Sequence, residues 1–475
     1  MISTISLKRP TWSSALLLAL LIAMNGMVLL NACLHNPSIG YDAGSHTKYM
    51  TTLAQGRLPT PADSNEFFSP PLAYVLPAIC TGALGLSTFW ALKMAQLFNV
   101  VLSVGICWFM LKLCELIRPG NAGLKLVSIL CLAILPVYYK TFAFVRGEPF
   151  VLFLTVRIAY DAMRLYGGSN ERPSHRLTAL LGIELGLLAL SRQWGFMLFP
   201  ALIAWVGLRA LKRPDFSRVV LSLATALTLS FAVGGWYYLH LWARYGSPTA
   251  FNHPPTTFSI RNQPLSFYLG TGTDHLFTAP VRPRFTNQFM PVFYSEIWGD
   301  YWNYFSVSGR DTRSGAQIFG PYLEERLAKK SGVALLETNW TTMTKYLGRV
   351  NAVSLFPTLL MTAGLMLGFW RLARLLLLRD PPPECGIAAL SALAVSTTLL
   401  GFLWFLIKYP SDSGNTIKAS YVIQIFPFIA ILTAETVLLL RKNAPVLATT
   451  AVIVLVAVGL HNTGAMITSY PLFPR

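Results

Sequence analysis

Long apolar stretches recur along almost the whole chain and are separated by short polar loops. A membrane-spanning helix needs about 20 mainly apolar residues. The pattern therefore predicts an all-α polytopic membrane protein, a bundle of about 11 transmembrane helices. The expected spans are 12–34, 93–116, 126–141, 149–166, 177–191, 194–209, 219–240, 351–370, 386–407, 419–440 and 444–465.

One interval, residues 241–350, contains no such apolar stretch. It divides the chain into an N-terminal transmembrane module (1–240), a larger external segment (241–350) and C-terminal transmembrane helices (351–475). Residues 72–90 are also apolar, but counting them as a full crossing would invert the orientation of every later loop. Pro70, Pro71 and Pro77 suit a helix that dips without spanning. We expect a re-entrant or juxtamembrane helix inside a long first external loop, residues 35–92.

Composition and charge support the membrane class and give an orientation. Hydrophobic residues make up 54% of the 475 residues and charged residues only 12%, with a mean hydropathy of +0.51. The net charge of +18 comes from basic residues scattered in short loops, so a nucleic-acid partner is not expected. One set of alternate loops, which includes Lys8 and Arg9, holds 18 basic residues, against 9 in the short loops and C-terminus of the other side. The positive-inside rule places the richer set and the N-terminus in the cytoplasm, and the compact loops favour a bacterial inner membrane.

The first external loop carries the earliest candidate for chemistry. Asp42 follows the first apolar run closely, so its carboxylate is expected at the membrane–water boundary. There it can serve as a general base on an acceptor hydroxyl or amine. The alternative is that Asp42 caps the helix that continues through His46 and Tyr49.

The first loop resembles a signature of the GT-C superfamily of membrane glycosyltransferases, which includes protein O-mannosyltransferases and aminoarabinose transferases (family 39-like). The resemblance rests on Asp42, His46 and Tyr49, then on the runs 53–59 and 69–74, and on a C-terminal motif at 414–421. It covers most of the chain, but the 241–350 segment matches only loosely, through 294–302. The resemblance implies a GT-C-like bundle with Asp42 as the catalytic residue and with His46 and Tyr49 at the substrate site.

The chain departs from that signature at one position. Many members carry Asp-Glu, whereas Ala43 follows Asp42 here. A second carboxylate, if required, must come from elsewhere, and Glu148 in the second external loop is a candidate. Bound metal is correspondingly less expected: no cofactor is predicted, although a divalent metal stays open.

A phosphate-linked donor requires fixed cations near the bilayer. External basic residues near helix ends are few, and the best placed are Arg146, Arg192, Lys408 and Lys418. Each is a candidate to hold the phosphate; the alternative is that its side chain extends to lipid headgroups. The alternative for Arg146 and Glu148 is a local ion pair.

Two further groups of residues complete the candidate set. In the external segment, Glu296 and Trp298 lie in an aromatic-rich run that suits acceptor binding, although an interfacial aromatic belt has the same composition. Glu184 and Glu435 fall inside predicted spans, and a structural bond is expected for Glu435. The six cysteines show neither metal-ligand spacing nor a disulfide framework.

These observations favour an inverting glycosyltransferase. Asp42 would deprotonate a lipid, glycan or protein acceptor, which then attacks a sugar carried on polyprenyl phosphate at the external face. Its partners would be that donor, the acceptor and membrane lipids. The alternatives are a transporter or flippase of lipid-linked glycans, against which the absence of an internal repeat speaks, and a surface-glycan ligase or polymerase.

Overall fold

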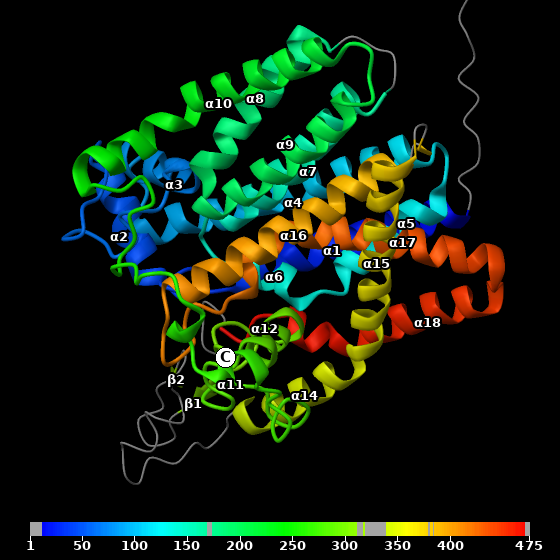
Figure 1. Cartoon of the computed structure of the whole chain (residues 1–475). Helices are drawn as coiled ribbons and strands as arrows, with labels where there is room; N and C mark the ends of the chain where they lie inside the picture. Colours follow the sequence, from blue (N-terminus) through cyan, green and yellow to red (C-terminus); the bar gives the residue numbers. More distant parts are fainter. Residues whose placement is uncertain are drawn as a thin grey trace, which may run out of the picture.

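The computed structural model describes residues 12–168, 173–310, 317–318, 339–378, 381–382 and 384–470. Apart from one antiparallel pair of two-residue strands, β1 (Gly309–Arg310) and β2 (Gln317–Ile318), the regular structure in these ranges is helical, which confirms the all-α class (Figure 1). Lys8, Arg9, Arg172 and Arg379, which contributed to the predicted orientation, lie outside the described residues.

The helices follow the predicted apolar runs in order. Their bounds are α1 (Trp12–Leu34), α2 (Ala43–Ala54), α3 (Leu72–Gly82), α4 (Thr88–Ile117), α5 (Ala122–Ala133), α6 (Pro136–Ala143), α7 (Glu148–Tyr166), α8 (His175–Ser191), η1 (Gln193–Met197), α9 (Leu198–Ala210), α10 (Phe216–Tyr245), η2 (Ile260–Asn262), α11 (Leu265–Leu269), α12 (Phe289–Trp298), α14 (Asn339–Val353), α15 (Leu355–Leu377), α16 (Glu384–Lys408), η3 (Ala419–Ile425), α17 (Phe426–Asn443), α18 (Pro445–His461) and η4 (Asn462–Met466).

Within the described ranges, seven helices are long and apolar enough to cross a membrane, or eight if the bent pair α5 and α6 counts as one span. The protein is therefore an integral membrane protein by the length and composition of its helices. The predicted total of about 11 is not reached by this measure. Helices do form at the predicted spans 149–166, 177–191 and 194–209, but α7, α8 and α9 fall short of the length or hydropathy that the others have.

Residues 72–90 do not form one helix: 72–82 form the short helix α3, which is not a candidate span, in agreement with the prediction, and 88–90 already belong to α4. Helix α3 has 11 residues, which at 1.5 Å per residue gives a length of about 16 Å. The hydrocarbon core of a bilayer is about 30 Å thick. Helix α3 packs against α2 and α4 and lies with α2 at one end of the bundle (Figure 1).

The predicted span over residues 126–141 is present as a bent pair of helices, α5 and α6. The chain bends by 65° between α5 and α6, because Pro136 opens α6 and a proline ring cannot continue the preceding helix. The bend brings α6 into contact with α12 of the external segment. Its Lys140 is fully buried and donates to a carboxylate oxygen of Glu296 at 2.9 Å.

The two acids predicted inside spans both have partners. Glu435 on α17 accepts from Arg118 at 2.8 and 3.0 Å and from Arg371 at 2.7 Å, which confirms the expected structural bond. Glu184 on α8 is paired with Arg157 on α7 at 2.9 Å. These pairs fasten neighbouring helices far from the external end.

Tight packing of α8 against α10 brings a tyrosine to the first loop. A Cβ added at Gly186 would lie 2.5 Å from Val233, and one at Gly182 would lie 2.7 Å from the carbonyl oxygen of Ala226. The glycines therefore allow close approach of the two helices. On the same helix α10, Tyr237 donates to the carbonyl oxygens of Phe67 and Ser69 at 3.1 and 2.7 Å, so the second half of the first loop is anchored to the bundle.

Candidate active site

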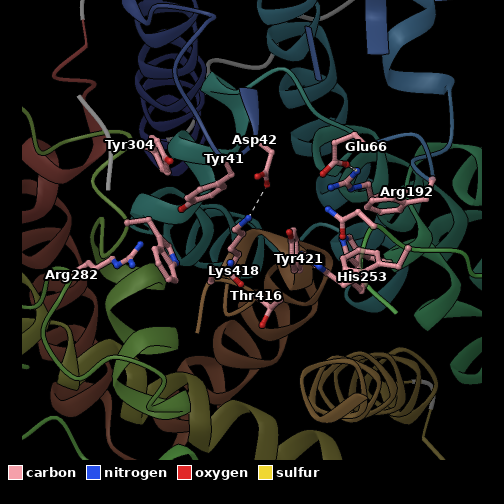
Figure 2. Close-up of a pocket in the computed structure, with 16 residues that line it drawn as sticks. Tyr41, Asp42, Glu66, Arg192, His253, Arg282, Tyr304, Thr416, Lys418 and Tyr421 are labelled. Atoms are coloured by element: carbon pink, nitrogen blue, oxygen red, sulfur yellow. Dashed lines mark hydrogen bonds and ion pairs between the residues drawn. The ribbon is translucent and has the colours of Figure 1, made fainter. Parts of the chain in front are cut away.

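A cavity of about 160 Å³ lies where the first loop, the turn after α8, the external segment and the loop before η3 meet (Figure 2). We call this the external end, following the charge pattern. The lining residues are Tyr41, Asp42, Glu66, Phe68, Arg192, Trp194, Phe251, Asn252, His253, Arg282, Trp302, Tyr304, Asn415, Thr416, Lys418 and Tyr421. Aromatic walls therefore surround a small number of charged groups.

Asp42 occupies the N-cap position of α2, yet its side chain makes no capping hydrogen bond. The cap interpretation is therefore not supported. The backbone of Asp42 has φ 56°, in the left-handed region that non-glycine residues rarely adopt. Gly40, two residues before Asp42, has φ +148°, and a Cβ there would lie 3.2 Å from the Phe144 ring. This turn aims the carboxylate into the cavity, as Figure 2 shows.

Asp42 and Lys418 form an ion pair across the cavity, with Nζ and Oδ2 3.0 Å apart. The lysine side chain is 10% exposed and its Nζ lies 5.0 Å from the Tyr41 ring centre and 5.5 Å from that of Tyr421. The charge of Lys418 holds the pKa of Asp42 well below its usual range, against the opposing effect of burial. Protein surrounds Asp42 on most sides, but its side chain remains 46% exposed because it faces the cavity. It is ionised and accessible at neutral pH.

A second acid, Glu66, lines the cavity and was not identified from the sequence. Its Oε2 lies 2.8 Å from the Arg192 guanidinium and also accepts from the Ser69 hydroxyl. Burial alone would raise the pKa of Glu66, but the charges of Arg192 and His46 and the hydrogen bond from Ser69 together outweigh it and lower the pKa to about 2. The Glu66 side chain is only 5% exposed. Glu66 is thus an ionised residue in the cavity wall, and its Oε2 is held by Arg192 and Ser69.

Behind this wall, Glu148 lies between two arginines. Its Oε1 is 3.0 Å from Arg146 and 3.4 Å from Arg192. The local pair of Arg146 and Glu148 is therefore present. A Cβ at Gly147 would lie 2.2 Å from the carbonyl oxygen of Ser191, so only glycine lets the two turns meet here.

This geometry corrects the expectation that Glu148 is a catalytic carboxylate. Glu148 is 1% exposed and does not line the cavity, because both of its oxygens face arginines. Arg146 is also buried, with its guanidinium 5.3 Å from the Tyr41 ring centre and 5.5 Å from that of Tyr421. It supports the two rings that flank Lys418 and does not reach the cavity surface.

His46 and Tyr49 on α2 are buried and are not among the residues that line the cavity. His46 Nδ1 lies 2.6 Å from the hydroxyl of Tyr74 on α3, and Tyr49 stacks on the Tyr74 ring with centres 4.1 Å apart. Burial lowers the pKa of His46 to about 4, so the ring is neutral. The direct substrate contact that the resemblance implied is therefore replaced by a contact that fixes α2 on α3.

The remaining predicted substrate residues also lie outside the cavity lining. Glu296 is fully buried and accepts from the Tyr41 hydroxyl at 2.5 Å and from Lys140 at 2.9 Å. Trp298 is 1% exposed and donates to Thr358 at 3.0 Å. The Lys408 ammonium lies 5.3 Å from the Trp404 ring centre, on the outside of α16. Of the predicted residues, only Asp42, Arg192 and Lys418 line the cavity.

Arg282 and Trp194 line the cavity and were not selected from the sequence, whereas Trp302, which also lines it, ends the aromatic-rich run 296–302 that was predicted to bind the acceptor. The guanidinium of Arg282 lies 5.3 Å from the Trp302 ring centre, and Trp194 stacks on Tyr421 with centres 4.6 Å apart. Trp194 directly follows Arg192 and Gln193 in a short external turn, and that position was the available signal. Among the described residues, no group of three His, Cys, Asp or Glu side chains is arranged to hold a metal ion.

No protein-family model matches the chain, and no curated protein matches its sequence. Among solved structures, the oligosaccharyltransferase of Archaeoglobus fulgidus in complex with zinc and sulfate is 12% identical, with a TM-score of 0.49, and the match covers 95% of this chain and 53% of that one. ArnT from Cupriavidus metallidurans bound to undecaprenyl phosphate is 13% identical, with a TM-score of 0.43 and coverages of 95% and 76%.

This chain spans about half the length of the oligosaccharyltransferase that it matches. The likeness concerns the course of the chain, so we argue the function from the side chains of the cavity.

Proposed function

We propose that this protein is a membrane glycosyltransferase that transfers a sugar from a polyprenyl-phosphate donor to a cell-envelope acceptor on the external face. Asp42 is the general base. The observation that carries the proposal is the pair of Asp42 and Lys418, an accessible carboxylate 3.0 Å from a lysine in a cavity at the end of membrane-spanning helices. Transfer from a lipid phosphate needs a proton acceptor and a cation for the departing phosphate in one small space.

The chemical step uses both groups. The acceptor oxygen or nitrogen attacks the anomeric carbon and loses its proton to Asp42. The bond between the anomeric carbon and the phosphate oxygen breaks, and its electron pair leaves with the polyprenyl phosphate. Attack opposite the leaving group inverts the anomeric configuration. Lys418 lies where it can stabilise the charge that develops on the departing phosphate.

The ion pair also suggests an order of binding. While Lys418 contacts Asp42, the carboxylate has a low proton affinity and is a weak base. The donor phosphate is a diester with one negative charge, and its two non-bridging oxygens compete with the carboxylate for the same ammonium. When the phosphate draws Lys418 away, the proton affinity of Asp42 rises towards that of an ordinary carboxyl group. Donor binding would thus activate the base.

The surrounding walls suit a sugar. Tyr304 lies on one side of the cavity, and Glu66 with Arg192 presents polar groups on the other (Figure 2). Trp302 is a further aromatic residue in the lining. Aromatic faces pack on the apolar sides of sugar rings, while charged groups take hydroxyls. Because Glu66 and Arg192 hold one another, their positions are set before the substrate enters.

The test compares Asp42→Asn with Asp63→Asn in purified protein reconstituted in lipid, with labelled sugars on polyprenyl phosphate and envelope extract as acceptor. Asp63 belongs to the same loop but is paired with Arg57 at 2.7 Å and does not line the cavity, so it is a matched control. We expect transfer to fall about 10²- to 10⁴-fold in Asp42→Asn and to be unchanged in Asp63→Asn.

Donor binding separates this proposal from the alternatives. Asp42→Asn should bind the donor at least as tightly as wild type, because Lys418 loses its competing carboxylate. Equal activity of both variants would refute Asp42 as the base. A wild type that transfers no sugar but moves lipid-linked glycan between vesicle leaflets would instead support a flippase.

A further inference from the structure

Part of the external segment exposes large apolar side chains although no membrane span was predicted there. Phe258, Ile260, Leu265 and Leu269 are 48%, 66%, 72% and 68% exposed. We call these four residues the apolar ledge. Water-exposed apolar groups of this size, gathered within twelve residues, mark a surface that contacts something else.

The ledge is held at the end of a spanning helix. Side chains of the 256–263 stretch cap the last carbonyl groups of α16. Thr256 Oγ1 donates to the carbonyl oxygen of Lys408 at 2.9 Å, Asn262 Nδ2 to that of Ile407 at 3.1 Å, and Gln263 Nε2 to that of Leu406 at 2.8 Å. Carbonyl groups at a helix end need such partners, above all near a bilayer.

The lipid-facing side of α16 fixes the level of this contact. Leu400 and Trp404 are 68% and 46% exposed on that helix, and the Lys408 ammonium lies over the Trp404 ring. Tryptophan and lysine near the end of an apolar helix are typical of the boundary between hydrocarbon and headgroups. The ledge, tied to the last turn of α16, is therefore placed at that boundary.

The ledge also has the chemistry of an interfacial element. In α11, Leu265 and Leu269 are four residues apart and share the outer face, while Phe267 between them is buried and packs near Phe289. Arg261 is the only charged residue between 258 and 269 and is exposed. The apolar side chains suit contact with lipid acyl chains, and the neighbouring Arg261 suits contact with an anionic headgroup.

We propose that the apolar ledge is buried in the outer leaflet of the bilayer and forms a membrane-bound rim of the cavity. The rim begins close to the cavity lining, since Phe251 lines it and packs on Tyr409, just after α16, with ring centres 4.8 Å apart. A lipid-borne molecule could then reach the cavity along this rim without its chain crossing water. The proposal concerns bilayer contact and holds whatever the cavity binds.

The test measures the depth of a bimane label in nanodiscs whose lipids carry a nitroxide at the fifth acyl carbon. Cys33 is the exposed native cysteine, and the other five are buried, so Cys33→Ser supplies the background. Labels go at Leu265→Cys, at Leu400→Cys as a lipid-facing reference, and at Thr273→Cys, an exposed position beyond α11. Leu269→Cys is the substitute if Leu265→Cys changes the elution volume of the purified protein.

We expect the label at 265 to be quenched at least about twice as strongly as the label at 273, and to approach that at 400. Quenching no stronger than at 273, together with access to a water-soluble quencher, would overturn the proposal. Protection from both quenchers would also overturn it, because a protein partner or a second copy would then cover the ledge. None of these readouts depends on sugar transfer.

Discussion

Replacing Lys418 with methionine should change donor affinity and pH dependence together. The ammonium and the Asp42 carboxylate are 3.0 Å apart, so Coulomb's law gives about 1.4 kcal/mol in water and about 5.5 kcal/mol at an effective dielectric constant of about 20. The Asp42 side chain is 46% exposed, so solvent screening favours the lower figure. About 1.4 kcal/mol corresponds to a roughly tenfold change in proton affinity.

The sign follows from the ion pair. Lys418 lowers the pKa of Asp42, so its removal makes the carboxylate easier to protonate. The acidic limb of the pH profile of kcat/KM should therefore move to higher pH by about one pH unit. The donor phosphate would also lose a charged hydrogen-bond partner, a loss of about 1.5–3 kcal/mol, so the KM for donor should rise roughly ten- to hundredfold.

Initial rates of labelled sugar transfer, measured from as low a pH as the enzyme tolerates, about pH 3, up to pH 8 at several donor concentrations, give both quantities. Lys408→Met is the matched control, because Lys408 is a second external lysine at a helix end but lies over Trp404 outside the cavity. Lys418→Arg keeps the charge and should keep the acidic limb in place. A Lys418→Met enzyme with wild-type KM and pH profile would refute the role of this pair, and so would an equal effect of Lys408→Met.

Three further predictions concern the support of the site. Glu296→Gln leaves the buried Lys140 without its counter-ion and should destabilise the protein by about 3 kcal/mol, measured by thermal unfolding in detergent; adding Lys140→Met should recover part of the loss. Gly40→Ala must adopt φ +148° and should cost about 1–3 kcal/mol while lowering kcat more than donor affinity. Burial lowers the pKa of His46 to about 4 and that of His35 to about 3, from an ordinary value of 6.5. Unfolding therefore takes up protons below pH 6.5, and the free energy of unfolding should fall between pH 6.5 and 4.5 by about 1.4 kcal/mol per pH unit for each histidine. His46→Gln should make this decrease less steep.

The sequence was sufficient for the fold class and for part of the site. Apolar runs of helical length predict the spanning helices directly, and the short run after Pro71 was correctly separated from them because its loop charges and prolines disfavour a crossing. The bend at Pro136 was missed, since hydropathy averages over the break. A proline inside an expected span was the available signal.

Asp42 and Lys418 could each be selected because each adjoins an apolar run on the side with few charges. Their contact could not be predicted, since the two residues are 376 positions apart in the chain. Glu66 belongs to no periodic pattern in the sequence, and only its ion pair with Arg192 in the structure identifies it as part of the site. Glu296 and Trp298 were assigned to a surface because an aromatic run with acids reads equally well as a binding face or as a core with buried hydrogen bonds.

The charged groups around the cavity differ in exposure, and that difference bears on their roles. Glu148 with its two arginines and Glu66 with Arg192 are buried pairs, and desolvation consumes most of the attraction in such pairs. These buried pairs therefore act mainly by fixing the positions of their side chains, because displacing either partner would leave a buried charge uncompensated. Asp42 is turned by a left-handed backbone towards the cavity, and its partner Lys418 sits between two tyrosine rings that Arg146 supports from behind. Of the two pairs that line the cavity, Asp42 with Lys418 has the exposed carboxylate, whereas Glu66 with Arg192 is buried. The proposed function therefore assigns the chemistry to Asp42.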